Sequence, residues 1–527
     1  MLLTNYKISN DKITYDGDYR LTEIVRQSTQ VFLENNEQII RPVEQRIAFK
    51  TDTRVPKLGF MFVGLSGNNG TTITAGMLAN KLGVTWETRE GLKQPDFYGS
   101  LSQSTVVRVG ELPSGEGIFI PFKDIAAVAD PRDVVIGGWD ISGKNLYEGA
   151  KDAHVLEPSL REALKEELSA ITPLPGYYSR DFIAPNQEAR ATNVLPLTMN
   201  KRAVVDKLKA DIAGFKQQHG LDKVVVLWTA TTERFAKIIE GVNDTWENLD
   251  KALAADHPEI APSTLYAVAA LEAGCPWING SPQNTNVPGV IDLAERTEGA
   301  VIGGDDFKSG QTKMKSLMVE FLCDAGIKPT CIASYNHLGN NDGYNLSNDA
   351  QFKSKEITKT HVIDDMVSDN EILFPKDSTC CPNSKAKVDH TVVIKYLPYV
   401  GDSKRAMDEY TSEIFLKGKN TIVMHNTCED SLLAAPLIMD LCLFAEMYSR
   451  VQYSVNGGKF KYFHPVCAIL SYFTKAPLAP CGNKNKVINA ISKQRMLLEN
   501  FCRAISGLPV EDHFMIEKLC TEFDAEA

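Results

Sequence analysis

Several lysines stand where their ammonium groups could take part in acid–base or oxyanion chemistry. Lys355 and Lys359 are four residues apart and would share one face of a helix. Lys404 and Lys475 lie far from them in the sequence, and Lys475 belongs to an apolar, aromatic stretch where burial would lower its pKa towards neutrality. Taken one at a time, each lysine is more simply interpreted as a solvated surface charge.

A glycine-rich turn at residues 64–72 (GLSGNNGTT) follows an apolar run at 57–64 that has the pattern of a buried strand. Residues 71–81 then have apolar spacing typical of a helix. Glycines allow the backbone N–H groups at a helix N-terminus to approach a pyrophosphate closely. However, the spacing is G-x-x-G-x-x-G instead of G-x-G-x-x-G, and no P-loop Lys-Ser/Thr follows it. The turn by itself is compatible with a dinucleotide site and with a plain strand–helix turn.

Two further polar turns could contact a substrate. Residues 303–313 lead from a strand into a helix expected at 314–322. A phosphomonoester could bind the N–H groups and hydroxyls of Ser309, Gly310, Gln311 and Thr312 there. An ordinary helix N-cap explains the same spacing. Residues 334–345 are dense in Asn and Gly, and this loop could hydrogen-bond a polyol or serve only as a turn.

The elements that would position these residues alternate between strand-like and helical patterns. Strands are expected at 57–64, 106–110, 134–140, 223–228, 276–280 and 301–304, and helices at 159–170, 202–218 and 249–256. Such alternation favours a parallel sheet covered on both faces. Residues 1–55 are expected to form a strand-rich arm. From about residue 330 the composition predicts a second, α+β domain with a strand at 387–396, before a helical return at 432–450.

Composition and charge narrow the class of protein. The net charge of -11 disfavours a nucleic-acid binder, because the phosphate backbone rewards basic surfaces. The eleven scattered cysteines and the absence of a secretory apolar region favour a reduced, cytoplasmic compartment. The longest apolar stretch, 432–447, contains Pro436, Asp440 and Glu446 and is too short and too charged to cross a membrane. No histidine spacing predicts a metal site.

In combination, these segments resemble the eukaryotic type of myo-inositol-1-phosphate synthase over most of the chain. The resemblance is carried by the stretches 64–72, 279–285, 303–313, 334–347, 353–365, 401–410 and 425–431. It implies an α/β fold in which a Rossmann-like NAD-binding domain (56–312 and 431–527) is interrupted by an α+β catalytic and tetramerisation domain (313–430). Residues 1–55 would be an N-terminal arm.

The resemblance also implies an isomerase at the first step of inositol biosynthesis, which supplies phospholipid biosynthesis and so belongs to lipid metabolism. Such an enzyme converts glucose 6-phosphate into 1L-myo-inositol 1-phosphate in the cytoplasm, as a homotetramer. NAD⁺ oxidises C5, a C6 proton is removed, the enolate attacks the C1 aldehyde, and the C5 ketone is reduced again. Lysines suit this chemistry because it needs a base and cations near developing oxyanions.

By the same resemblance, each candidate residue has an expected role. Lys355 would transfer the proton at the C5 oxygen, and Lys404 and Lys475 would stabilise the C1 oxyanion. Asp306 would belong to the catalytic set. Lys359 and Lys404 would help to hold the phosphate beside residues 309–312. NAD would be bound by a larger set: Gly64, Gly67, Asn68, Asn69, Asp140, Thr231, Asn340, Asn341, Asp342, Asp402, Asp430 and Ser431.

Two other functions would use the same features. A net dehydrogenase of a sugar phosphate would use the same glycine turn but release NADH, and the several dispersed lysines favour the aldol enzyme over it. A non-catalytic NAD-binding regulator would keep the glycine turn without needing the lysines.

Overall fold

A six-stranded parallel sheet forms the centre of the larger part of the molecule, with the strand order β10-β9-β4-β11-β12-β13. The computed structural model describes the whole chain apart from residues 4, 113, 377–386, 481–486 and 515–527. The strands are β4 (Leu58–Val63), β9 (Val135–Asp140), β10 (Leu174–Pro175), β11 (Lys223–Trp228), β12 (Trp277–Asn279) and β13 (Ile302–Gly303). Every strand expected for this sheet belongs to it except the strand at 106–110.

Helices cover both faces of this sheet because its strands are apolar on both sides. In β4, Phe60 and Phe62 enter one core and Met61 and Val63 enter the other, and all four are buried. The covering helices are α1 (Asn68–Leu82), α4 (Leu146–Ala153), α5 (Pro158–Ala163), α6 (Lys165–Ala170), α7 (Lys201–His219), α8 (Trp246–Ala254), α9 (Pro262–Glu272) and α10 (Pro288–Arg296). The core on one face contains α1, and the core on the other contains α7 and α9.

The strand expected at 106–110 is present, but its expected place in the parallel sheet is wrong. It is β7 (Val106–Glu111), which pairs antiparallel with β8 (Gly117–Pro121) in a separate two-stranded ribbon. A parallel partner requires a crossover of a dozen or more residues, whereas the connection here is short enough only for a hairpin.

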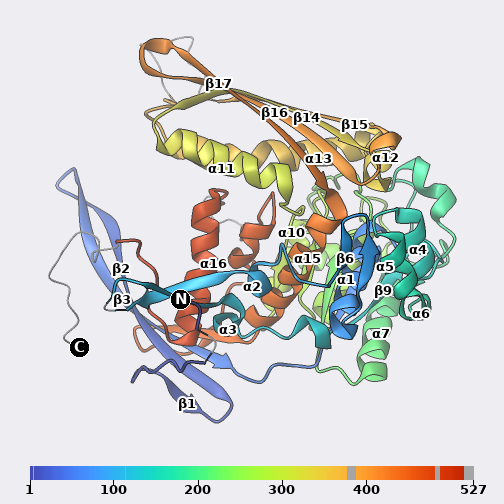
Figure 1. The fold of residues 1–527 in the computed structure, drawn as a ribbon, viewed down its shortest axis with the longest axis horizontal. Helices are drawn as coiled ribbons and strands as arrows, with labels where there is room; N and C mark the ends of the chain where they lie inside the picture. The colour runs from blue at the N-terminus through green and yellow to red at the C-terminus, as the bar shows by residue number, and fades with distance from the viewer. Residues whose placement is uncertain (4, 113, 377–386, 481–486, 515–527) are drawn as a thin grey trace.

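The N-terminal arm is strand-rich, as expected, and it joins a segment from the far end of the chain. Its strands are β1 (Thr14–Asp16), β2 (Tyr19–Glu34) and β3 (Glu37–Asp52), and β2 and β3 form one long hairpin that projects from the body in Figure 1. Asn35 and Asn36 make the turn with positive φ angles, which asparagine tolerates. β3 also pairs with β18 (Val451–Val455), which in turn pairs with β19 (Lys461–Tyr462).

A second sheet of four strands lies at the top of Figure 1, with its order β15-β14-β16-β17. The strands are β14 (Lys328–Leu338), β15 (Asp389–Tyr396), β16 (Ser403–Glu413) and β17 (Lys419–Glu429). Helices α11 (Gly310–Asp324) and α13 (Asp349–Thr360) cover the inner face, and short helices α12 (Asn341–Asn345) and α14 (Asp364–Asp369) complete the layer. Alternate residues of β17 are exposed, so the outer face of this sheet is open.

Helix α15 (Asp430–Tyr448) carries the chain from β17 back to the first sheet. Its length and apolar composition would suffice to cross a membrane, yet most of the helix is buried in the protein interior. It packs against α1 and β11, and α16 (Ile491–Ser506) belongs to the same core. The start of α15 is thereby placed at the junction of the two sheets.

Candidate active site

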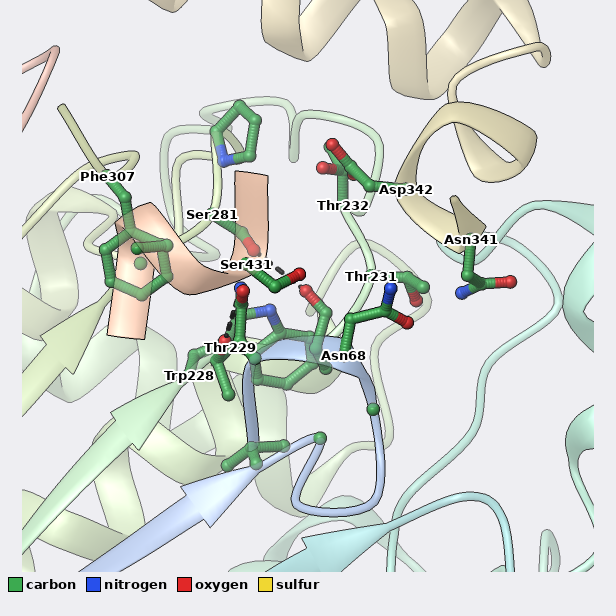
Figure 2. A pocket seen from close by; sticks show the side chains of 18 of the residues that line it. Asn68, Trp228, Thr229, Thr231, Thr232, Ser281, Phe307, Asn341, Asp342 and Ser431 are labelled. Carbon is green, nitrogen blue, oxygen red and sulfur yellow. Dashed lines mark hydrogen bonds between the residues drawn. The ribbon is translucent and has the colours of Figure 1, made fainter. Parts of the chain in front are cut away.

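A cavity opens where the carboxyl ends of the central strands meet α12, α13 and the start of α15 (Figure 2). Figure 2 shows Asn68, Thr231 and Ser431 around one space, although they come from three separate parts of the chain. The sequence-predicted residues that line it are Gly64, Gly67, Asn68, Asn69, Asp140, Thr231, Asp306, Ser309, Asn340, Asn341, Asp342, Lys355, Lys404, Asp430, Ser431 and Lys475. Ligand sites in open α/β sheets form at this edge.

The remaining predicted residues lie beside or behind this cavity. Asp402 lines an adjoining depression that shares Gly67, Asn68 and Asn340 with the cavity. Lys359, Gln311 and Thr312 are buried and lie outside the cavity lining, as does Gly310. The two turns and the four lysines are therefore neighbours in space, but they do not all face the same opening.

The glycine turn is shaped so that side chains are excluded from it. Gly64 has φ of +93°, and a Cβ there would lie 2.6 Å from the backbone of Ala230. A Cβ on Gly70 would lie 2.2 Å from the carbonyl oxygen of Leu65. Gly67 begins α1 as its N-cap, so the first N–H groups of the helix have no side-chain cap from that residue. The turn thus presents an uncapped helix N-terminus, which suits a pyrophosphate.

Asp140 holds the glycine turn in place. Its Oδ2 accepts from the backbone N–H of Ser66 at 2.9 Å, and its Oδ1 accepts from the N–H of Ser142 at 2.9 Å. The expected contact with a ribose would therefore use the remaining lone pairs of a carboxylate that already fixes two loops. Asn69 donates from Nδ2 to Thr229 Oγ1 at 3.1 Å, which joins the turn to the end of β11.

Asp306 lies at the centre of the lysine cluster. Its Oδ1 contacts Lys475 Nζ at 2.9 Å and Lys355 Nζ at 3.1 Å, and its Oδ2 accepts from Thr358 Oγ1 at 2.8 Å. The backbone N–H of Lys475 also donates to the Asp306 carbonyl at 2.8 Å. All three charged side chains are largely buried. Three residues that are far apart in the sequence are therefore in direct contact beside the cavity.

Burial and the neighbouring charges shift the pKa of Lys475 and the pKa of Lys355 in opposite directions. Burial lowers the pKa of Lys475 to about 7; Asp306 opposes this effect, and Lys355 and Lys404 add to it. Burial also works against the charge on Lys355, but Asp306, Asp342 and Asp430 outweigh it and raise the pKa of Lys355. Despite burial, the two ammonium groups lower the pKa of Asp306 to about 2. At neutral pH Lys475 can exchange a proton, whereas Lys355 stays a cation.

A second ion pair closes the other side of the cavity. Lys404 on β16 lies 3.3 Å from Asp430 Oδ1 at the start of α15. Burial would raise the pKa of Asp430, but Lys404, Lys355 and Lys475 lower it. Asp342 adds a further carboxylate 3.9 Å from Lys355 Nζ. Cations and anions therefore alternate around the opening.

Asp402 fixes the start of α15. It accepts from the backbone N–H and the hydroxyl of Ser431, each at 2.8 Å, and from Asn340 Nδ2 at 2.9 Å. Burial and the nearby Asp430 raise the pKa of Asp402. These bonds join α12 to α15, so Asp402 positions two groups of the cavity wall.

The turn predicted to bind phosphate begins α11. Ser309 is the N-cap, its side chain makes no capping bond, and no acidic residue occurs in the first turn. Behind it, Lys359 Nζ donates to Gln311 Oε1 at 3.0 Å and to Asn336 Oδ1 at 3.1 Å. Burial and the surrounding lysines hold the pKa of Lys359 well below its usual value. A helix N-terminus beside this group of lysines attracts anions, because an anion there would relieve the repulsion between their ammonium groups.

Sequence reasoning missed several polar residues of this region. Thr358 could have been found, because it lies three residues after Lys355 on the same face of α13. Asn336 and Asp408 lie within the singled-out stretches 334–345 and 401–410 but were not named as site residues, and Lys315 lies in none of these stretches; only the packing of α11 and α13 on the sheet brings the three together. The described ranges contain no group of three His, Cys, Asp or Glu side chains that could hold a metal ion.

The fold and the cavity define an enzyme of the NAD-binding, Rossmann-like type with a group of buried lysines beside the cavity. A family model for myo-inositol-1-phosphate synthase matches residues 58–503. Inositol-3-phosphate synthase isozyme 1 of Arabidopsis thaliana is 53% identical over 525 residues, covering 98% of this chain and 100% of that protein. Inositol-3-phosphate synthase 1 of Oryza sativa is 52% identical with the same coverage.

A solved structure agrees with these sequence relatives. Inositol-3-phosphate synthase from Caenorhabditis elegans has a TM-score of 0.93 and 45% identity, covering 98% of this chain and 99% of that chain. The chain belongs to the myo-inositol-1-phosphate synthase family. The family, the α/β fold class, the enzyme class and the NAD cofactor predicted from the sequence are confirmed.

Proposed function

We propose that this protein converts glucose 6-phosphate into 1L-myo-inositol 1-phosphate by an NAD-dependent oxidation, enolisation, aldol closure and reduction. The observation that carries this proposal is the contact of Lys355 and Lys475 with one carboxylate, Asp306, in the cavity beside the glycine turn. A reaction that forms a ketone, an enolate and an aldolate needs a base and several cations within one closed site.

The glycine turn fits the NAD pyrophosphate. Gly64 and Gly70 leave no room for side chains, and Gly67 keeps the N-terminus of α1 uncapped. Asn68, Asn69 and Thr231 line the cavity, where they would contact the rest of the dinucleotide. NAD⁺ held there would supply a hydride acceptor for C5 of the sugar and, once reduced, a hydride donor.

The phosphate of the substrate would bind at the start of α11. Ser309 and the first N–H groups of the helix supply donors, and Lys359 and Lys404 supply positive charge. A phosphate dianion there compensates ammonium groups that otherwise repel one another. Binding the phosphate at this wall would direct the sugar ring towards Lys355 and Lys475.

Proton transfer at the C5 oxygen is assigned to the Lys355–Asp306–Lys475 unit. Lys475, with a pKa of about 7, is the member suited to change charge at neutral pH. Lys355 keeps its charge and stabilises negative charge as it develops on oxygen. This assignment differs from the expectation that Lys355 itself exchanges the proton, and the reason is that three carboxylates hold Lys355 protonated.

The aldol step places negative charge on the C1 oxygen. Lys404, held by Asp430 at the far side of the cavity, is the cation proposed to stabilise it. Asp402 supports that pair, because it fixes Ser431 next to Asp430 in sequence. The buried surroundings strengthen each of these interactions relative to water.

A homotetramer is proposed from the open face of the four-stranded sheet. Tyr335, Met407 and Val423 are exposed there on three neighbouring strands, β14, β16 and β17. An apolar group of this kind on a sheet face favours burial against another copy. A cytoplasmic location is proposed because the described cysteines are free thiols: Cys275, Cys323, Cys331, Cys428, Cys442, Cys467 and Cys502.

The proposal is tested by incubating the purified protein with glucose 6-phosphate and NAD⁺ and identifying the product by chromatography and NMR. Inositol phosphate should form while the NADH concentration stays constant. Stoichiometric release of NADH would instead assign the protein to the sugar-phosphate dehydrogenases. Absence of any product with the NAD-loaded protein would contradict the proposed catalysis.

A further inference from the structure

The side chain of Gln311 lies between a cation and an anion. Its Nε2 donates to Asp408 Oδ1 at 2.7 Å, and its Oε1 accepts from Lys359 Nζ at 3.0 Å. A carboxylate only accepts, so the amide must turn its Nε2 towards Asp408, and this leaves Oε1 facing Lys359. Asp408 therefore determines which end of Gln311 faces Lys359.

Asp408 is built into the layer behind the cavity. It lies on β16 with its side chain towards α11, and only 1% of the residue is exposed. Tyr410, two residues along the same face of the strand, donates from its hydroxyl to Asp408 Oδ2 at 3.3 Å. Asp408 lies outside the cavity lining, and its hydrogen bond to α11 is made through Gln311.

Lys359 depends on amide oxygens for its hydrogen bonds. Besides Gln311 Oε1, the ammonium group donates to Asn336 Oδ1 at 3.1 Å. The charged and titratable groups that face it from the packed elements are Lys315 on α11, Lys355 on its own helix, His390 on β15, Lys404 on β16 and Lys475, which follows the 3-10 helix Ala468–Phe473. If the Gln311 amide were turned over, its NH2 group would meet the ammonium, and Lys359 would lose half of these acceptors.

We propose that Asp408 is a positioning residue that holds the Gln311 amide so that Lys359 keeps its ammonium group available to the substrate phosphate. This inference rests on the proposed function, in which Lys359 stands behind the phosphate at the start of α11. It assigns Asp408 a role in substrate affinity, although Asp408 touches neither substrate nor cofactor.

Three variants at two positions distinguish the effect of the Gln311 amide orientation from the effect of the negative charge of Asp408. Asp408→Leu removes the acceptor, so the KM for glucose 6-phosphate should rise at least about tenfold, with a smaller change in kcat. Asp408→Asn keeps an amide oxygen for Gln311 Nε2, so its KM should stay within about threefold of the parent protein. Tyr410→Phe, which removes the other bond to Asp408, is the matched control and should also retain its KM.

The pH dependence adds a readout that a general loss of packing would not give. The pH above which KM rises should move to lower values in Asp408→Leu. Without Asp408 the Gln311 amide is free to turn, and Lys359 loses a proton more readily when Gln311 Oε1 no longer accepts from it. The same pH should be unchanged in Asp408→Asn. If Asp408→Asn loses substrate affinity as severely as Asp408→Leu, the negative charge and not the amide orientation is responsible, and the inference is wrong.

A charge transposition keeps the inference testable even if Asp408→Leu fails to fold. Gln311→Glu places two carboxylates against each other, and its affinity for inorganic phosphate, measured by calorimetry on the NAD complex, should fall at least about tenfold. In Gln311→Glu/Asp408→Asn the new amide can donate to the new carboxylate, which in turn accepts from Lys359. This double variant should bind phosphate more tightly than Gln311→Glu alone, and equal affinities would refute the inference.

Failure of the inference is distinguishable from failure of the proposed function. If the parent protein makes no inositol phosphate, the proposed function fails whatever the variants do. If the parent protein is active and Asp408→Leu keeps its KM and pH profile, only the role of Asp408 is refuted. NAD affinity should stay unchanged in all five variants, because Asp408, Tyr410 and Gln311 lie away from the glycine turn.

Discussion

Replacing Asp306 with asparagine removes the charge that Lys355 and Lys475 share without removing much volume. Asp306 Oδ1 lies 2.9 Å from Lys475 Nζ, and at an effective dielectric constant of about 20 this pair interacts by about 6 kcal/mol. At about 1.4 kcal/mol per pKa unit, this energy corresponds to a shift of about four units in the pKa of Lys475, as an upper bound. Because the new amide oxygen still accepts a hydrogen bond, we expect the pKa of Lys475 to fall by at least about one unit from its value of about 7.

The assay is the pH dependence of kcat for inositol phosphate formation. A base must be neutral to accept a proton, so the parent rate should fall below a pH of about 7 as Lys475 becomes protonated. In Asp306→Asn the pH at which the rate falls should be at least about one pH unit lower. The maximal rate should drop at least about a hundredfold, because Lys355 and Lys475 are no longer held together. Glu356→Gln on α13, which loses only the exposed pair with Lys353, is the control. If the rate of Asp306→Asn still falls below a pH of about 7 and stays within about threefold of the parent rate, this reasoning is refuted.

Three further predictions follow from the same geometry. Lys355→Ala should lose at least about a hundredfold in activity while its dissociation constant for NAD, measured by calorimetry, stays within about threefold; equal loss of NAD affinity would contradict its assignment to the substrate side. Gly67→Ala should weaken NAD binding at least about tenfold, because its methyl group would fill the cradle at the start of α1, whereas Gly76→Ala on the same helix has free space and should not. Lys308→Met tests a buried amine whose pKa burial lowers from 10.5 to about 7. The unfolded chain takes up this proton below about 10.5, so lowering the pH towards 7 favours unfolding through Lys308, and Lys308→Met lacks this contribution. The melting temperature of the parent relative to Lys308→Met should therefore increase as the pH rises from 7 to 9, and a constant difference would contradict the burial argument.

The sequence predicted the central sheet well because its strands are short apolar runs followed by glycine or polar turns. Residues 57–64 and 223–228 are examples, and both are present as β4 and β11. It misplaced 106–110, because an isolated strand pattern does not say whether its partner is a nearby hairpin or a distant parallel strand. The pairing of β3 with β18 was not expected for a related reason, since contacts between the two ends of a chain leave no local signal.

The site likewise divides into features with a local sequence pattern and contacts between distant segments that leave none. The turns at 64–72 and 303–313 could be recognised as candidate anion sites from glycine spacing alone, but each had an equally simple structural interpretation. The roles of the lysines depended on the resemblance, because nothing local to Lys355 or Lys475 reveals that they meet at Asp306. Asp408 could not be found at all, because its importance comes from an amide on α11 that packs against β16 only in the folded protein.

The central claim is that a hydride leaves C5 of the sugar and returns to the same carbon within one binding event. It is tested most directly by supplying glucose 6-phosphate with deuterium at C5, together with unlabelled NAD⁺, and measuring the label in the product by mass spectrometry and NMR. The account predicts inositol phosphate that keeps the deuterium at the carbon derived from C5, with unlabelled NAD⁺ remaining. Deuterium found in accumulated NADH, or lost to solvent, would contradict it.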